Sequence, residues 1–152
     1  MSDNNNIKAN TSFASNRFQH PSPGVGAVGQ YQLSGIPFAT ASAYIESDAS
    51  GEGPLQISFP YVTKFITVVN EHSGSSSKLR VGFSALGVTG TNDTGKNYFL
   101  LDNGESYTGE FRASSVFLLG NSAATTASVI AGMTGIPSYK LENNWSGTSG
   151  VG

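Results

Sequence analysis

The sequence predicts an all-β protein: an antiparallel β-sandwich, jelly-roll-like, with about eight or nine strands and extended N- and C-terminal arms. Apolar and polar residues alternate from Pro54 onward, which is the period of strands that have one buried face. Turn residues such as Gly, Asn and Ser recur about every 8–12 positions, a spacing typical of short antiparallel strands. Since no stretch shows the period of an amphipathic helix, we expect a fold built from strands.

The composition of the two ends divides the chain into one domain and two arms. We expect an extended N-terminal arm over residues 1–23, a β-sandwich domain over 24–137 and a C-terminal tail over 138–152. Both ends are rich in Asn, Ser and Gly and lack a sustained apolar period. Such segments cannot bury enough surface to offset the entropy that is lost when they become ordered. We therefore expect a neighbouring protein to hold them.

The first half of the domain contains four strand candidates. The first two are weak, because only a pair of apolar residues shares a face, Tyr31 and Leu33 in the first of them. The other two meet near Pro60 and show either clear alternation or many β-branched and aromatic residues. In chain order, the four candidates are residues 26–34, 40–47, 55–59 and 62–69.

The second half contains five strand candidates with clearer patterns. Leu79, Val81 and Phe83 alternate with polar or small residues, which predicts a strand with one solvated face. Asn103-Gly104 stands between two later candidates, and this dipeptide favours the tight turn of a β-hairpin because both central positions need positive φ. We therefore expect the strands on either side of it to pair. In chain order, the five candidates are residues 78–86, 98–101, 106–111, 114–120 and 124–136.

Charged residues are scarce and scattered along the chain. They make up 12% of the residues, against about 25% in an average soluble domain, and the net charge is −2. Lys78 and Arg80 are the only close pair among the 8 Lys and Arg, so the chain lacks the basic patch that duplex nucleic acid requires. We expect no direct binding to nucleic acid.

Two further absences in the sequence narrow the possible functions. The chain has no Cys, which excludes disulfides, thiolate metal sites and cysteine nucleophiles. It also has no apolar run approaching about 18 residues and no basic segment followed by an apolar one at its N-terminus. We expect no membrane insertion and no signal peptide, and hence a protein made in the cytoplasm of the cell that produces it.

A glycine-rich string precedes the first strand candidate of the domain. Residues 24–29, Gly-Val-Gly-Ala-Val-Gly, match the GxGxxG pattern of dinucleotide-binding proteins. That pattern functions only between a strand and a helix, where the helix N-terminus meets the pyrophosphate. The sequence predicts neither neighbour, so we interpret the string as a flexible hinge between arm and domain.

The residues available for catalysis are few. His20 and His72 are the only histidines for a Ser-His-acid triad, and no GxSxG elbow occurs. Glu71, Glu105 and Glu110 are the candidates for a pair of glycosidase carboxylates, and the acids in the loops suit calcium. Neither arrangement has specific spacing. We expect no catalytic, cofactor-binding or metal-binding residues, with a calcium ion in a loop left open as an alternative.

Aromatic residues are the remaining candidates for contact with a ligand or partner. Tyr and Trp suit protein interfaces because they offer a large area at low entropy cost, and they also stack on sugars. Tyr139 and Trp145, near the C-terminus, are candidates for either contact. Interface or core positions are the favoured roles for most of the aromatic residues.

The chain resembles a class of known proteins in its composition and its turn residues. Four of its segments have low charge, turns rich in Gly, Ser, Thr and Asn, and no Cys. They are FPYVTKFITVVN, KLRVGFSALGVTGTN, NYFLLDNGESYTGEFRASSVFLLG and ASVIAGMTGIP. In these features it resembles the small β-sandwich capsid-associated proteins, decoration or minor capsid proteins, of phages and other icosahedral viruses. The resemblance implies a location in the virion. It also implies the major capsid protein or other virion proteins as partners, and no catalytic residue.

The N-terminal arm contains three spaced apolar residues, Ile7, Phe13 and Phe18. Their spacing of five or six residues predicts anchors that dock into separate pockets along an extended path. We expect a non-enzymatic virion structural protein, a homo-oligomer that binds a capsid lattice through its arms and sandwich surface. The alternative is a carbohydrate-binding or adhesin module of a fibre or spike, which would bind a glycan. An enzyme is the least favoured class.

Overall fold

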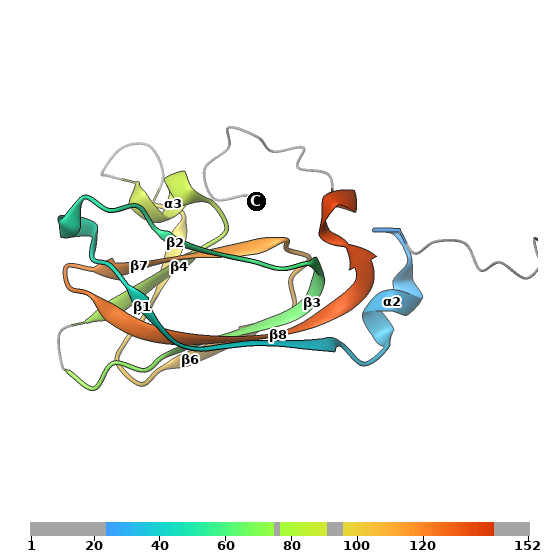
Figure 1. The fold of residues 1–152 in the computed structure, drawn as a ribbon, viewed down its shortest axis with the longest axis horizontal. Helices are drawn as coiled ribbons and strands as arrows, with labels where there is room; N and C mark the ends of the chain where they lie inside the picture. Colours follow the sequence, from blue (N-terminus) through green and yellow to red (C-terminus); the bar gives the residue numbers. More distant parts are fainter. Residues whose placement is uncertain (1–23, 75–76, 91–95, 142–152) are drawn as a thin grey trace, which may run out of the picture.

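The protein is an all-β sandwich of eight strands in two antiparallel sheets (Figure 1). The structure is a computed structural model and describes residues 24–74, 77–90 and 96–141. The first sheet contains, in spatial order, β1 (Ile36–Ile45), β8 (Thr125–Pro137), β3 (Tyr61–Asn70) and β6 (Ser106–Gly109). The second contains β2 (Leu55–Ser58), β7 (Ser115–Asn121), β4 (Lys78–Gly82) and β5 (Tyr98–Leu101).

The connectivity of these strands is that of a jelly roll. Strand β1 pairs with β8, β2 with β7, β3 with β6 and β4 with β5, and each pair is antiparallel. The chain therefore follows the course of one long hairpin that is rolled into two facing sheets. This arrangement confirms the jelly-roll prediction and the number of strands within its stated range.

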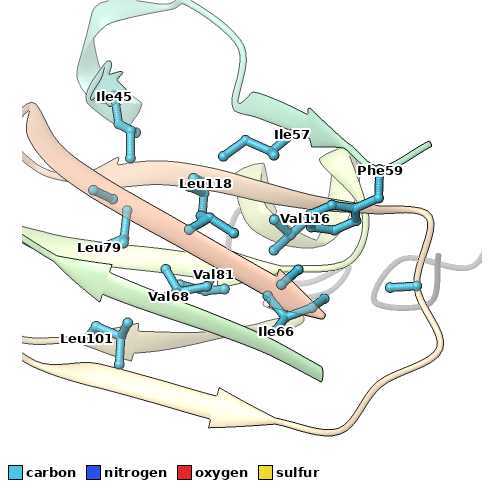
Figure 2. Close-up of a cluster of buried hydrophobic side chains, with 14 of the residues drawn as sticks. Ile45, Ile57, Phe59, Ile66, Val68, Leu79, Val81, Leu101, Val116 and Leu118 are labelled. Carbon is cyan, nitrogen blue, oxygen red and sulfur yellow. The ribbon is translucent and has the colours of Figure 1, made fainter. Parts of the chain in front are cut away.

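The hydrophobic core lies between the two sheets and is filled by inward residues of every strand except β6 (Figure 2). Ile66 and Val68 of β3 face Leu79 and Val81 of β4, and all four side chains are buried. Their neighbours in sequence point outward, because successive side chains of a strand alternate between faces. Burial of a large aliphatic side chain stabilises the fold by about 1.5–3 kcal/mol, so this alternation sets which face of each strand turns inward.

One predicted strand is wrong and another is too long, because short helices form in or after them. Residues 26–34 contain helix α2 (Val28–Gln32), and the predicted strand 78–86 stops at the end of β4 and is followed by α3 (Ala85–Thr89). Helix α3 begins where the Ser84 hydroxyl accepts a hydrogen bond from the Gly87 N–H at 3.1 Å, an N-cap. Helix α2 is held by tertiary contacts, since the Gln30 amide oxygen accepts from the Gly135 N–H at 3.2 Å. Two 3₁₀ turns, η1 (Asp48–Ser50) and η2 (Ser138–Lys140), complete the helical segments of the described residues.

The turn at Asn103-Gly104 forms, but the hairpin predicted around it does not. The Glu105 N–H donates to the Asp102 carbonyl at 3.1 Å, and Gly104 has a φ of 72°. The chain nevertheless crosses here from one sheet to the other, since β5 pairs with β4 and β6 pairs with β3. At the crossing the rings of Phe99 and Tyr107 lie 4.7 Å apart, with Phe99 packed against the core and Tyr107 still 43% exposed.

The sandwich has two distinct ends, to which we give fixed names. The helix end comprises α2, the starts of β1 and β3, the segment between β6 and β7, and η2. The loop end comprises residues 46–54, 71–74, 102–105 and 122–124. The two ends lie at opposite extremes of the longest axis (Figure 1). Helix α2 packs on β8 and η2 packs on β3, so the described chain both begins and finishes at the helix end.

Candidate functional site

The outer surface of the first sheet is almost free of charge. Within β1, β8, β3 and β6, Lys64 is the only charged residue. We call the outward side chains of these four strands the sheet face. Positions that point to solvent on a sandwich usually hold polar or charged residues, but Ala, Thr, Ser and Gly occupy most of them here, together with Ile130, Phe65 and Tyr44. The sheet face is therefore a broad surface that a partner can cover with little desolvation of charge.

The middle of the sheet face is flat because small and β-branched residues lie in register across it. Ala39, Ile130, Thr67 and Thr108 form one row across the four strands. Ile130 is 47% exposed, which is unusual for a large aliphatic side chain at the centre of a sheet. The hydroxyl oxygens of Thr67 and Thr108 lie 2.8 Å apart and satisfy one another. The row thus presents methyl groups to solvent.

The neighbouring row is flattened by one aromatic ring. Phe65 pairs with Gly132, and its ring lies over the glycine on the outer side of the sheet. A Cβ added at Gly132 would lie 2.2 Å from the Phe65 ring, so only glycine permits this approach. Gly132 therefore allows the ring to cover the sheet instead of standing out from it.

A β-bulge limits the free edge of the sheet face at β1. The register of β1 with β8 shifts between Thr40 and Ala43, and Ser42 in the shift has a φ of 51°. The Ser42 N–H donates to the Ser128 hydroxyl oxygen at 3.1 Å, and the Ser42 hydroxyl donates to the Glu71 carboxylate at 3.0 Å. Bulges of this kind twist an edge strand away from unwanted strand pairing. The flat sheet face, and not the β1 edge, is accordingly the better surface for a partner.

The outer side of the second sheet differs because segments of the same chain cover part of it. Arg80 of β4 is the centre of this covering layer and is joined to Asp48 of η1 by an ion pair. Its guanidinium also donates to the Asn121 side chain at 2.8 Å and the Val88 carbonyl at 3.3 Å, and it lies 4.8 Å from the Tyr98 ring centre. These contacts engage the donor groups of Arg80 within the chain, so the residue is structural.

A small hollow of about 260 Å³ opens at the helix end, between α2 and the segment that follows β6. It is smaller than the about 300–1,000 Å³ of most small-molecule sites, so it suits one side chain better than a cofactor. The Lys64 ammonium donates to the Leu33 carbonyl at 2.6 Å, and the Arg112 guanidinium lies 4.8 Å from the Tyr31 ring centre. The residues that line the hollow are Val28, Tyr31, Lys64, Glu110, Phe111 and Arg112.

The site residues predicted from sequence fall mostly outside the described residues. This applies to Ile7, Phe13 and Phe18 of the N-terminal arm and to Trp145 of the tail. Tyr139 lies in η2 and is 82% exposed, as an interface or ligand residue requires. The other described tyrosines are spread over both sheets and both ends, so they do not form one sugar-stacking platform.

Of the residues considered for catalysis, His20 lies outside the described residues, and Glu71 and Glu105 share the loop end. Both oxygens of the Glu71 carboxylate accept hydrogen bonds from serine hydroxyls, those of Ser42 and Ser128, instead of orienting the His72 ring. Glu110 lies at the helix end, whereas Glu71 is at the loop end. Over residues 24–74, 77–90 and 96–141, no three His or carboxylate side chains gather to hold a metal ion. In the same ranges, no helix has the length and apolarity needed to cross a membrane.

Sequence reasoning did not identify the sheet face, although a signal for it exists. The outward positions of residues 36–45, 61–70 and 125–137 hold Thr, Ser, Ala and Gly where Lys and Glu are usual on a solvated strand. That pattern acquires meaning only once the three segments are known to be neighbours in one sheet. The alternation alone gives the faces of each strand and not the partners of each strand.

Comparison with known proteins gives one weak likeness to report. No protein-family model matches the sequence, and no curated protein is significantly similar to it. Among solved structures, the chain is similar to a subunit of the Bacillus endospore appendages, described as a novel family of disulfide-linked pili. That match has 19% sequence identity and a TM-score of 0.32, and it covers 65% of this chain and 82% of the pilus chain.

Proposed function

We propose that this protein is a non-enzymatic structural component of a virion, a decoration or minor capsid protein that binds a capsid lattice. The observation that supports the proposal best is the sheet face, which has no charged side chain except Lys64 at its border. The buried centres of protein interfaces are likewise depleted of charge. The partners are the major capsid protein or other virion proteins, and the chain acts as a homo-oligomer.

The chemistry of the sheet face favours another folded protein as its partner. When a partner covers Ile130, Ala39 and the threonine methyl groups, the complex is stabilised by about 25 cal/mol for each Å² of apolar area removed from water. A flat row of such groups fits a second flat surface, since it has no deep pocket for a small ligand. The arms add a second means of attachment, with Ile7, Phe13 and Phe18 as the proposed anchors.

Substitution of the central exposed residue of the sheet face tests the proposal. Purified particles from the cells that make the protein are stripped of it and then mixed with recombinant full-length chain. We expect the wild type to rebind to them and Ile130→Lys to bind at least about tenfold more weakly, because a buried unpaired ammonium is costly. Cosedimentation with the particles measures the bound fraction.

A matched control distinguishes the sheet face from a general effect of charge. Leu86 in α3 is 66% exposed and lies over the second sheet, so Leu86→Lys adds the same charge on another face. The control variant is expected to bind like the wild type. Absence of the protein from purified particles, or equal binding by all three forms, would refute the proposed role.

Carbohydrate recognition by a fibre or spike module is the second candidate. It draws on Tyr139, whose ring is 82% exposed at the helix end, close to the partly exposed Tyr61. Exposed aromatic rings of this kind are suited to stacking on sugars. A glycan array with the full-length chain tests this candidate, and saccharide binding that is lost in Tyr139→Ala would favour it over the capsid role.

A further inference from the structure

Most acidic residues within the described part of the chain are gathered at the loop end. Of the seven acids in the described residues, only Glu110 lies elsewhere. The two basic residues at that end are already engaged, since Lys78 pairs with Asp102 at 2.7 Å and Arg80 pairs with Asp48. The loop end therefore carries an excess of negative charge. Its acidic residues are Glu46, Asp48, Glu52, Glu71, Asp102 and Glu105.

One of these pairs shows the effect of the local charge. The hydrogen bond and the negative charge of Asp102 raise the pKa of the Lys78 ammonium above its usual value. Glu105 adds to the same rise. The loop end thus favours bound positive charge, which is the expected behaviour of a surface with surplus carboxylates.

The helix end has the opposite charge and is also apolar. Lys64, Arg112 and Lys140 lie there with Glu110 as the only acid in the described part of this end. Half of the exposed large hydrophobic side chains of the described residues are at this end as well. They are Val28 at 66%, Leu33 at 61%, Ile36 at 45%, Tyr61 at 36% and Tyr139 at 82% exposure.

We propose that the helix end of one copy of this chain binds the loop end of another copy. The charges of the two ends are complementary, and complementary charge steers association and fixes orientation. The hollow at the helix end adds a receptor for one side chain, with Lys64 and Arg112 at its wall. A loop carboxylate that enters it meets the two positive charges of Lys64 and Arg112 against the single negative charge of Glu110, while the apolar residues around it are covered.

The position of the two ends determines the kind of assembly. They are different surfaces at opposite extremes of the longest axis, so the contact is head-to-tail (Figure 1). A head-to-tail contact leaves one end free on each outer copy, and it continues as an open row or closes into a ring. The sheet face runs along the side of the molecule and stays uncovered by this contact. The inference therefore stands independently of the binding proposed for the sheet face.

Sedimentation velocity of the full-length chain tests the contact. We expect oligomers at about 0.01 M salt that dissociate at about 1 M salt, where the Debye length falls from about 30 Å to about 3 Å. Val28→Glu places a negative charge beside the hollow, and Glu52→Lys reverses a charge at the exposed loop end. Each variant is expected to weaken self-association at least about tenfold.

Mixing the two variants is the decisive measurement. The Val28→Glu copy keeps an intact loop end and the Glu52→Lys copy keeps an intact helix end, so an equimolar mixture should form dimers and nothing larger. Leu86→Glu is the matched control, since Leu86 and Val28 are both 66% exposed, and it should associate like the wild type. Circular dichroism of each variant verifies the fold.

Several results would overturn the inference. A full-length chain that stays monomeric at low salt has no such contact, and oligomers that tighten with salt are held by another surface. Failure of the mixture to form dimers points to an isologous interface, in which both copies use the same patch. None of these results affects the particle-binding test of Ile130→Lys, so binding to the capsid lattice and the head-to-tail contact fail separately.

Discussion

At the scale of single residues, the Asn70 side chain links several segments of the fold through hydrogen bonds. Its side chain is fully buried at the end of β3, where its amide nitrogen donates to the carbonyls of Ser77 and Leu101 at 3.0 and 3.2 Å. Its amide oxygen accepts from the Thr125 hydroxyl at 2.7 Å and the His72 N–H at 3.3 Å. One side chain thereby ties together the loop-end segments of both sheets.

Replacement of Asn70 by alanine should therefore be costly. The change leaves several buried carbonyl and hydroxyl groups without a partner, and each such group costs about 1–3 kcal/mol. We expect Asn70→Ala to lower the free energy of unfolding by about 3 kcal/mol or more, measured by urea denaturation. Asn103→Ala is the control, because the Asn103 amide oxygen accepts no hydrogen bond within the described residues. Equal losses in the two variants would contradict the assigned role.

At the scale of elements, the bulge in β1 makes a specific demand on backbone conformation. Ser42 has a φ of 51°, a region that β-branched residues avoid at a cost of about 1–3 kcal/mol. We expect Ser42→Val to lower the thermal midpoint clearly, whereas Ser42→Gly should stay close to the wild type. Differential scanning fluorimetry measures both. A valine variant as stable as the glycine variant would show that the bulge relaxes without cost.

The elements also show how far the sequence alone leads. Alternation found β2 and β4, because a residue period of two directly reports a buried face, whereas β3, β7 and β8 were found as runs of β-branched, aromatic or other apolar residues. It missed the five-residue helix α2, because Tyr31 and Leu33 fit one face of a strand and so short a segment shows no helical period. Contacts with distant residues decide that case, such as the bond from the Gly135 N–H to the Gln30 side chain. Local propensity cannot include such contacts.

The turn at Gly104 shows that a correctly predicted turn does not determine which strands pair. Asn-Gly correctly predicted a tight turn, but turn chemistry says only that the chain reverses. Whether the flanking strands then pair depends on partners elsewhere in the chain, and β3 and β4 were the stronger partners here. The sheet face was out of reach for the same reason, since it depends on which strands are neighbours.

At the scale of the whole molecule, the sandwich holds together without the N-terminal arm. The two sheets, the core and the packing of α2 all involve residues from Gly24 onward. Deletion of residues 1–20 is therefore expected to leave the far-ultraviolet circular dichroism spectrum and the thermal midpoint unchanged. The same deletion should abolish attachment to particles if Ile7, Phe13 and Phe18 are anchors. Attachment at the wild-type level would contradict the anchor role.

The strand order of the first sheet affects how the protein folds during its synthesis. Strand β8 comes last in chain order among the described strands, yet it lies between β1 and β3 and pairs with both. Until it leaves the ribosome, the sheet exists as separate pieces with open edges, and such edges are prone to join other chains. Contacts between distant parts of a chain also form slowly. The first sheet can therefore be completed only after β8 has been synthesised.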